Sequence, residues 1–375
     1  MLNTEELVRY SRHFSLSEVG VAGQEKLKSA RVLCIGAGGL GSPLLLYLAA
    51  AGIGTIGIMD DDFVDLSNLQ RQVLYTTQDI SKKKVDIAKA KLAELNPHIN
   101  IIAYAERLNK ENALNIIKNY DVIADGTDNF PTRYLVNDAC FHAQKPNVYA
   151  SIFQFEGQCS VFNAHKNAPC YRCLYDSPPP AGLIPNCAEG GVLGVLPGMI
   201  GTIQAIEVIK LILNIGSSLI GRLLTVDALS MRFQEFEIKQ HPDCRLCTHH
   251  QAFETLPDYS LISCATAIDN IDEISVKALH QLLRDKKQEF MLLDVRERHE
   301  YAICNLGGVL IPLGELNNKI SELDKHKSYV IHCKSGERSR KTVKLLKEAG
   351  FTSVKNLSGG ISAWAREIDR NMPVY

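Results

Sequence analysis

The sequence lacks the features that would direct the protein to a nucleic acid, a membrane or the secretory route. Its 41 basic and 42 acidic residues leave a formal net charge of −1, so there is no excess of positive charge to attract nucleic acid or an anionic membrane. No segment reaches the ~20 apolar residues expected of a membrane span, and the polar N-terminal residues contain no apolar core of a signal peptide. We therefore expect a cytoplasmic protein whose partners are chosen by local sites.

The length of the chain predicts two domains. A chain of 375 residues exceeds what one hydrophobic core usually organises, and the sequence shows no internal repeat and no low-complexity tract. Residues 251–271 carry mixed polar side chains without clear periodicity, so we predict a linker there. The chain is thereby divided into a first domain of residues 1–250 and a second domain of residues 272–375.

Alternating strand and helix patterns predict an α/β fold in both domains. Between Ala30 and Asp62 the sequence runs from a strand through a glycine-rich turn and an apolar helix to a second strand, which opens a Rossmann-like, doubly wound sheet. From Ile274 a shorter alternation of helices and strands begins, so the second domain is expected to be a smaller α/β unit.

A nucleotide-binding motif opens the first domain. Gly36, Gly38 and Gly41 form a G-x-G-x-x-G pattern between a strand and a helix, where backbone N–H groups can approach a phosphate. Asp60, at the end of the next strand, stands where an acidic residue would hold ribose hydroxyls. On these features alone a NAD-binding oxidoreductase remains open, beside a purely structural glycine turn.

Polar residues beyond the second strand favour ATP chemistry over hydride transfer. In adenylation a carboxylate attacks the α-phosphate and pyrophosphate leaves, so growing negative charge has to be neutralised. Arg71 and Lys84 supply positive charge, and Asp128 follows a strand end as a carboxylate suited to Mg²⁺. The alternative is that Arg71 and Lys84 are merely surface charges on a solvated helix.

The first domain resembles the ThiF/MoeB family, whose members are relatives of the ubiquitin-activating enzymes, over about residues 1 to 250. The resemblance rests on RYSRH at residues 9–13, GAGGLGS, the D-x-V-D-x-S-N-L-x-R-Q string, GTDNF and CYRCL. It implies a mixed sheet of the ubiquitin-activating-enzyme type. It also implies that ATP and Mg²⁺ are bound by Gly39, Gly41, Asp60, Asn68, Arg71, Gln72, Lys84 and Asp128.

The same resemblance implies a homodimer in which Arg12 reaches the γ-phosphate bound by the neighbouring subunit. It places the catalytic roles in the first domain on Arg71, Lys84 and Asp128. Lys84 is preferred to the two lysines before it because of its offset from the Asn-Pro-His triplet at residues 96–98.

The eleven cysteines point to metal binding, catalysis or burial, because a reducing cytosol keeps thiols free. The spacings Cys170-x-x-Cys173 and Cys244-x-x-Cys247 suit tetrahedral Zn²⁺ with two thiolates from each pair. A redox pair is the weaker alternative, since no thioredoxin-like context surrounds either motif. The substitute ligands are His241, His249 and His250.

Cys187 lies in a Pro-Asn-Cys-Ala-Glu-Gly-Gly loop that we expect to cross in front of the nucleotide region. By its resemblance to the family it matches a loop cysteine that, in some relatives, forms a covalent link with the carrier protein. We therefore predict that the Cys187 thiol takes part in the reaction, with an incidental cysteine as the alternative.

A cysteine loop marks the second domain. Cys333 ends a strand and precedes a helix, so backbone N–H groups of the loop are expected to surround its sulfur and stabilise an anion or a persulfide. A cysteine phosphatase would place arginine six residues after the nucleophile. Here Arg338 lies five residues after it, and the shorter loop favours sulfur over phosphate.

Residues 272–375 resemble a rhodanese domain. The resemblance rests on LDVRERHEY at residues 293–301, on the Cys333 loop and on LSGGISAW at residues 357–364. Asp294 and Arg296 are expected to serve the scaffold rather than the chemistry. The chain departs from many rhodaneses around Cys304, where it reads Cys-Asn-Leu-Gly-Gly-Val instead of Gly-His-Ile-Pro-Gly-Ala, which leaves the donor preference open.

Together the two resemblances predict an adenylyltransferase joined to a sulfurtransferase. ATP would activate the C-terminal glycine of a small ubiquitin-like sulfur carrier protein ending in Gly-Gly, and a Cys333 persulfide, charged by a cysteine desulfurase or thiosulfate, would convert it into a thiocarboxylate. Fused MoeB-rhodanese proteins make molybdopterin synthesis with a MoaD-like carrier the leading pathway. Thiamine synthesis through a ThiS-like carrier and tRNA thiolation stay open, as do the oxidoreductase and a noncatalytic binding protein.

Overall fold

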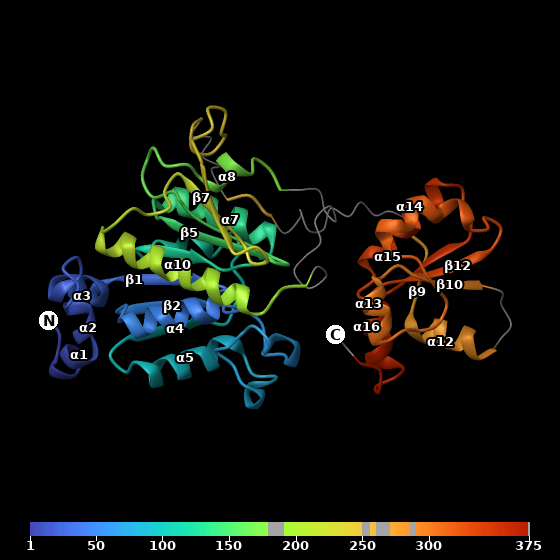
Figure 1. The fold of residues 1–375 in the computed structure, drawn as a ribbon, viewed down its shortest axis with the longest axis horizontal. Coiled ribbons are helices and arrows are strands. Elements are labelled where there is room, and N and C mark those ends of the chain that lie inside the picture. The colour runs from blue at the N-terminus through green and yellow to red at the C-terminus, as the bar shows by residue number, and fades with distance from the viewer. Residues whose placement is uncertain (179–190, 250–255, 260–270, 286–289, 374–375) are drawn as a thin grey trace. The chain divides into compact units, whose positions relative to one another are not determined.

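The chain forms two compact units in the computed structural model, Met1–Ala265 and Thr266–Tyr375 (Figure 1). The structure describes residues 1–178, 191–249, 256–259, 271–285 and 290–373. Each unit has its own sheet and its own buried core, as an independent domain requires.

An eight-stranded mixed sheet forms the centre of the first unit, which confirms the predicted Rossmann-like fold. The strand order is β3-β2-β1-β4-β5-β6-β7-β8; the pairs from β3 to β5 are parallel and those from β5 to β8 are antiparallel. The strands are β1 (Arg31–Ile35), β2 (Thr55–Met59), β3 (Asn100–Tyr104), β4 (Val122–Asp125), β5 (Asn147–Phe153), β6 (Glu156–Phe162), β7 (Arg222–Asp227) and β8 (Arg232–Glu237).

Helices cover both faces of this sheet. Alternate residues of a strand point to opposite faces, and in β1 the side chains of Val32 and Cys34 enter one core while those of Leu33 and Ile35 enter another. The α-helices are α1 (Thr4–Arg9), α2 (Ser11–Phe14), α3 (Gly20–Ser29), α4 (Gly41–Ala51), α5 (Lys84–Leu95), α6 (Ala113–Ile117), α7 (Phe130–Ala143), α8 (Tyr171–Leu174) and α10 (Val195–Leu213). Two 3₁₀ turns, Leu66–Asn68 and Thr77–Asp79, lie between β2 and α5.

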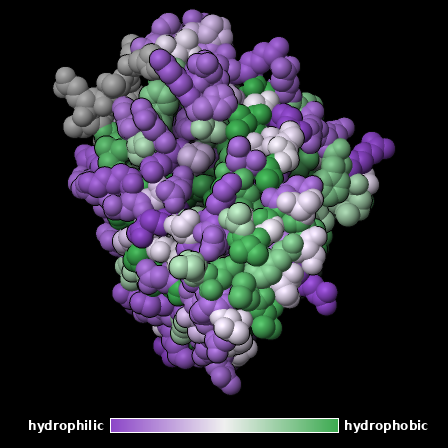
Figure 2. Space-filling view, turned by 90° about the vertical axis from the view of Figure 1, so that its left-hand side faces the viewer, coloured by the Kyte–Doolittle hydropathy of each residue, from purple (hydrophilic) through white to green (hydrophobic). Residues whose placement is uncertain are grey.

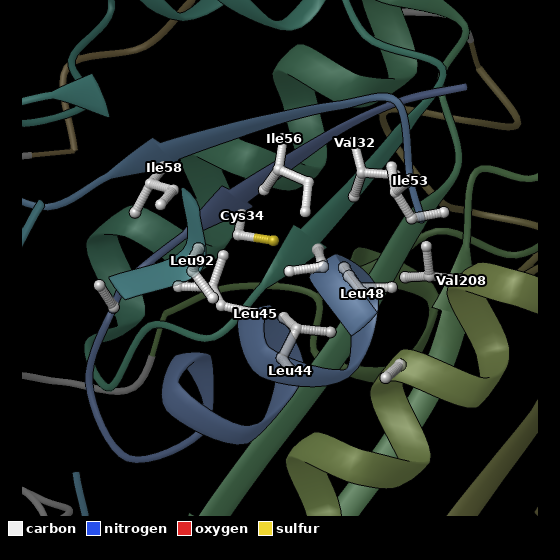
Figure 3. Close-up of a cluster of buried hydrophobic side chains, with 14 of the residues drawn as sticks. Val32, Cys34, Leu44, Leu45, Leu48, Ile53, Ile56, Ile58, Leu92 and Val208 are labelled. Carbon is white, nitrogen blue, oxygen red and sulfur yellow. The ribbon is translucent and has the colours of Figure 1, made fainter. Parts of the chain in front are cut away.

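The first of these cores holds α4 against the parallel strands. Figure 3 shows Leu44, Leu45 and Leu48 of α4 gathered below Cys34 and Ile56 of the sheet, and all five side chains are fully buried. Burial raises the pKa of the Cys34 thiol well above its ordinary value, so this cysteine is a packing residue. Because the core fixes α4, it also fixes the glycine-rich turn that precedes the helix.

Helix α10 corrects the expectation that no segment is long enough to cross a membrane. Its nineteen residues meet that requirement by length and apolar composition. However, α10 packs against α4, β5 and β6, and Leu196, Ile200 and Val208 are fully buried there. Its apolar sequence therefore has the pattern of a core helix.

The second unit is a smaller α/β domain with a five-stranded parallel sheet of order β11-β10-β12-β13-β9. Its strands are β9 (Glu273–Ile274), β10 (Phe290–Asp294), β11 (Val309–Leu310), β12 (Ser328–His332) and β13 (Val354–Leu357). Its α-helices are α12 (Val276–Asp285), α13 (Arg298–Ile303), α14 (Leu316–Lys319), α15 (Glu337–Glu348) and α16 (Gly360–Glu367), with 3₁₀ turns at Leu313–Glu315 and Ile320–Glu322.

The predicted linker 251–271 is not uniform, because part of it packs on the first unit. Leu256 and Tyr259 are buried among the residues of α6 and α7. The Tyr259 hydroxyl donates a hydrogen bond to Asp138 and contacts Arg172, whose guanidinium forms two 3.0 Å hydrogen bonds to the Asp138 carboxylate. The first unit therefore extends beyond the predicted boundary at residue 250.

Candidate functional site

Two glycines shape the turn between β1 and α4. Gly36 has φ +93°, a conformation that other residues rarely adopt. At Gly41, a Cβ atom would lie 2.1 Å from the Gly36 carbonyl oxygen, so only glycine fits at the first position of α4. The turn is held from outside by the Asp60 carboxylate, which accepts a 2.8 Å hydrogen bond from the backbone N–H of Ala37. This close packing leaves the N-terminus of α4 facing an open pocket.

The pocket beside this turn has a volume of about 380 Å³ and contains most of the predicted nucleotide-binding residues. It lies at the carboxyl ends of the parallel strands, where doubly wound sheets bind their ligands. The predicted residues that line it are Gly39, Asp60, Asn68, Arg71, Gln72, Lys84 and Asp128.

Lys84 and two aspartates form the charged floor of the pocket. Lys84, the first residue of α5, is buried, and its Nζ atom lies 2.8 Å from Asp62 and 3.9 Å from Asp60. Burial raises the pKa of Asp60 above its usual value, and the charge of Lys84 opposes that shift. The lysine is thus fixed in place by carboxylates, which supports the choice of Lys84 from the three neighbouring lysines.

On the other side of the pocket lie the polar side chains of Gln72, Arg71 and Asp128. The Gln72 side-chain oxygen is buried and has no hydrogen-bond partner among the described residues. Arg71 is half-buried, and one of its guanidinium nitrogens donates to the carbonyl oxygen of Ser67 at 3.1 Å. Asp128 is exposed at the mouth. A buried polar atom without a partner is costly, so Gln72 fits a pocket that is completed by a ligand.

Two of the predicted residues, Gly41 and Arg12, do not line this pocket in the described part of the chain. Gly41 is not a lining residue; it permits the close backbone packing that gives the glycine turn its shape. Arg12 is exposed on α2. Cys187 lies outside the described residues.

Arg133 lines the pocket but was not among the predicted residues. It is buried in the first turns of α7, where its guanidinium donates two hydrogen bonds to the Thr127 carbonyl oxygen at 2.9 and 3.2 Å. The same guanidinium lies 5.5 Å from the ring centre of Phe130 and 5.6 Å from that of Tyr149. The sequence signal was its position five residues after Asp128, because Asp128 directly precedes the N-cap of α7 and Arg133 lies in the first turn of that helix.

The four predicted zinc ligands come together at one point. The sulfur atoms of Cys170 and Cys173 are 3.8 Å apart, those of Cys170 and Cys244 3.6 Å, and those of Cys173 and Cys247 3.3 Å. Tetrahedral Zn²⁺ with bonds of about 2.3 Å holds its sulfurs roughly 3.8 Å apart. All four sulfurs lie within 4.8 Å of one another, so the donor set fits zinc in number, chemistry and spacing. This geometry does not require His241 or His249 as a substitute ligand, and His250 lies outside the described residues.

Cys333 lies in a tight loop between β12 and α15 in the second unit. It is almost fully buried, and its sulfur accepts a 3.1 Å hydrogen bond from the backbone N–H of Gly336, the N-cap of α15. Gly336 has φ +102°. The N–H of Ile361 donates to the Cys333 carbonyl oxygen at 2.9 Å, and at Gly360 a Cβ atom would lie 2.5 Å from that oxygen. The LSGGISAW motif therefore stabilises the cysteine loop by packing and hydrogen bonding against the Cys333 carbonyl group.

Buried polar residues support this loop. Arg296 is fully buried and grips the Asp294 carboxylate with hydrogen bonds of 2.6 to 3.0 Å. Glu300 and Arg338 form a two-pronged ion pair at 2.6 and 2.7 Å, which ties α13 to α15. Of these residues, Asp294 and Arg296 have the scaffold position that was expected from the sequence.

Family models match both units in chain order. Residues 10–246 match the ThiF family, and residues 275–367 match the rhodanese-like domain. Similar curated proteins have the same pair of activities in their names. A probable adenylyltransferase/sulfurtransferase MoeZ of Mycobacterium tuberculosis is 44% identical over all of this chain and 96% of its own length, and an adenylyltransferase and sulfurtransferase MOCS3 of Culex quinquefasciatus is 41% identical over all of this chain and 90% of its own.

A solved structure agrees with the fold of the first unit. The E. coli MccB structure with MccA-N7isoASN has a TM-score of 0.57 and 25% identity, and the match covers 66% of this chain and 75% of that one. The pocket and the two cysteine sites therefore lie in recognised domains. The chain belongs to the ThiF family, ends in a rhodanese-like domain, and is an adenylyltransferase and sulfurtransferase.

Proposed function

We propose that the protein adenylates the C-terminal glycine of a small ubiquitin-like sulfur carrier protein and then converts it into a thiocarboxylate. The observation that supports this most is the pocket at the strand ends, which combines a glycine turn with Arg71, Lys84 and Asp128 in one unit while a second unit presents Cys333. Cytoplasmic molybdopterin synthesis with a MoaD-like carrier is the pathway we propose.

The first step is carried out in the pocket. The glycine carboxylate attacks the α-phosphorus of ATP, the bond from that phosphorus to the bridging oxygen breaks, and pyrophosphate leaves with its electron pair. Arg71, Lys84 and the N–H groups at the start of α4 stabilise the charge that develops on the phosphates. Asp128 supplies carboxylate oxygen that would hold Mg²⁺, which neutralises phosphate charge when bound, and Asp60 would hold the ribose hydroxyls.

The second step uses the rhodanese-like domain. The outer sulfur of a Cys333 persulfide attacks the acyl carbon of the adenylate, and AMP leaves with the electron pair of the broken C–O bond. A thiol then cleaves the resulting acyl disulfide between its two sulfurs, which releases the thiocarboxylate and leaves a disulfide. We propose Cys187 as this thiol. The buried zinc cysteines have a structural role in this scheme.

We also propose a homodimer, because Arg12 is not among the described residues that line the pocket of one chain. Exposed apolar side chains on α3, α4 and α10, namely Val21, Tyr47 and Ile206, offer surface for a second copy, and Figure 2 shows apolar side chains gathered across this side of the molecule. Mixing Arg12→Ala and Asp128→Ala subunits should test it. If Arg12 acts across the interface, mixed dimers regain one intact site each, and about a quarter of the wild-type exchange activity returns. No recovery would contradict an Arg12 contribution from a second copy.

ATP–pyrophosphate exchange with Mg²⁺ and a panel of purified carriers ending in Gly-Gly tests the function as a whole. We expect exchange with a MoaD-like carrier; exchange with a ThiS-like carrier or a tRNA-thiolation modifier instead would assign another pathway. Cys333→Ala should abolish thiocarboxylate formation and leave exchange intact, whereas Asp128→Ala should abolish exchange and leave thiosulfate sulfurtransfer intact. Loss of both activities in the Cys333 variant would contradict this division of labour.

A further inference from the structure

The Ser339 hydroxyl lies beside the sulfur of Cys333 and has more acceptors around it than it can serve. Its Oγ atom is 3.4 Å from the Cys333 sulfur, 3.1 Å from the Gly336 carbonyl oxygen and 2.6 Å from the side-chain oxygen of Asn356. Both Ser339 and Asn356 are fully buried. A hydroxyl has one proton to donate, so the Cys333 sulfur receives a hydrogen bond from Ser339 only when neither of the other two acceptors takes that proton.

The orientation of the Asn356 amide is fixed by Glu273 on the edge strand β9. The Asn356 side-chain nitrogen lies 3.3 Å from the Glu273 carboxylate, which is held in place by Ser358 at 2.6 Å and Arg340 at 2.5 Å. Hydrogen bonds from Ser358 and Arg340 lower the pKa of Glu273, so the carboxylate is ionised and only accepts hydrogen bonds. The amide must therefore present its NH₂ group to Glu273 and its oxygen to Ser339.

This arrangement directs the Ser339 proton to Asn356, at the shortest of its three contacts. We propose that Glu273, acting through Asn356, is a positioning residue that withholds the Ser339 hydrogen bond from the Cys333 thiolate and so limits its formation in the resting enzyme. The Gly336 N–H then remains as the hydrogen-bond donor to the sulfur that the described residues show. The inference rests on the proposed role of Cys333 as the sulfur-carrying residue.

Other charged and titratable groups lie around the same loop and have to be held constant in the test. They come from β10, β12, α13, α15 and the loops that follow β10 and β12, and are Asp294, Arg296, His332, Glu300, Lys334, Glu337 and Arg338. The side-chain hydrogen bonds that the structure describes for Asn356 join it to Ser339 and Glu273. Substitution at residue 273 changes the contact to Asn356 and also those to Arg340 and Ser358, so matched variants are needed.

Alkylation of Cys333 in the full-length protein measures thiolate formation without requiring sulfur transfer. After iodoacetamide treatment at a series of pH values, the tryptic peptide 328–334 reports Cys333 as its single cysteine. Glu273→Ala frees Asn356 to turn, so that Ser339 can donate to the thiolate; the midpoint pH of alkylation should fall by about one unit, as one added hydrogen bond to a charged group implies. Glu273→Met, which keeps the length of the side chain, should do the same.

Matched variants separate this effect from loss of charge. Glu273→Gln keeps an oxygen for both Arg340 and Asn356, so its midpoint should equal that of the wild type; a fall like that of Glu273→Ala would mean that charge alone is responsible. Ser339→Ala should leave the wild-type midpoint unchanged and cancel the shift of Glu273→Ala in the double variant. An unshifted Glu273→Ala protein, or a raised midpoint in Ser339→Ala alone, overturns the proposal. Sulfur transfer that survives Cys333→Ala would instead refute the proposed function and leave the alkylation result standing.

Discussion

His332 should make the stability of the rhodanese-like domain depend on pH. The ring is fully buried, and neither of its nitrogens has a hydrogen-bond partner among the described residues. Burial lowers the pKa of His332 from 6.5 to about 4; the nearby Asp294 charge opposes the shift, and Arg296 adds to it. The unfolded chain therefore binds a proton between these two values that the folded domain does not bind. The domain therefore has its full free energy of unfolding above pH 6.5, and His332 lowers that free energy as the pH falls toward 4.

The size of the effect follows from the two pKa values. Linkage gives a loss of about 2 kcal/mol in the free energy of unfolding between pH 7 and pH 5. The chain has one tryptophan, Trp364, and it is buried in this domain, so its fluorescence reports denaturant unfolding of the rhodanese-like domain within the full-length protein. Replacing His332 with Asn removes the titrating group and should flatten the dependence.

A control is needed because the His280 ring lies 5.5 Å from the Trp364 ring and its protonation can change the fluorescence. Unfolding midpoints should therefore be compared instead of intensities, with His280→Gln as the matched variant that keeps the pH dependence. Equal slopes between pH 7 and pH 5 in wild type and His332→Asn would refute the reasoning.

Three further predictions concern the first unit. Gly41→Ala should abolish nucleotide exchange, because its Cβ would meet the Gly36 carbonyl oxygen at 2.1 Å, whereas Gly198→Ala, with open space around it, should retain the activity. Leu48→Ala should lower the free energy of unfolding by about 2 to 5 kcal/mol, measured by denaturant titration, and a loss below 1 kcal/mol would show that the core can close around the cavity. Purified protein should contain one zinc per chain by elemental analysis, and Cys244→Ser should lose that metal and lower the thermal midpoint; full zinc content in this variant would contradict the four-cysteine site.

The fold could be predicted because its signals are local. The alternation of strands and helices and the glycine turn before α4 depend on neighbouring residues, and the structure confirms the α/β class of both units. The convergence of Asp60, Lys84 and Asp128 at one pocket also followed, since carboxyl ends of parallel strands meet at one edge of the sheet.

What the sequence did not reveal depends on contacts between distant residues. Arg133 looked like an ordinary helical arginine until the structure placed it against the Thr127 carbonyl oxygen and two aromatic rings. Glu273 lies 60 residues before Cys333 in the chain, and its link through Asn356 cannot be read from spacing. Length and composition alone give α10 the character of a membrane span, and only its contacts with α4, β5 and β6 show that it is a core helix.

The buried Tyr259 side chain marks a point at which the first unit holds the chain before the second unit begins. It pins the chain to Asp138 and Arg172 of the first unit, and Ile271, twelve residues later, packs in the core of the second. A fully extended chain of that length spans at most about 40 Å. In the proposed reaction the Cys333 domain is thus an intramolecular sulfur donor, whose effective concentration depends on the length of chain that joins it to the first unit. Arg172 lies between Cys170 and Cys173 in the sequence, so a metal ion bound by the four cysteines would also hold the residue that contacts Tyr259.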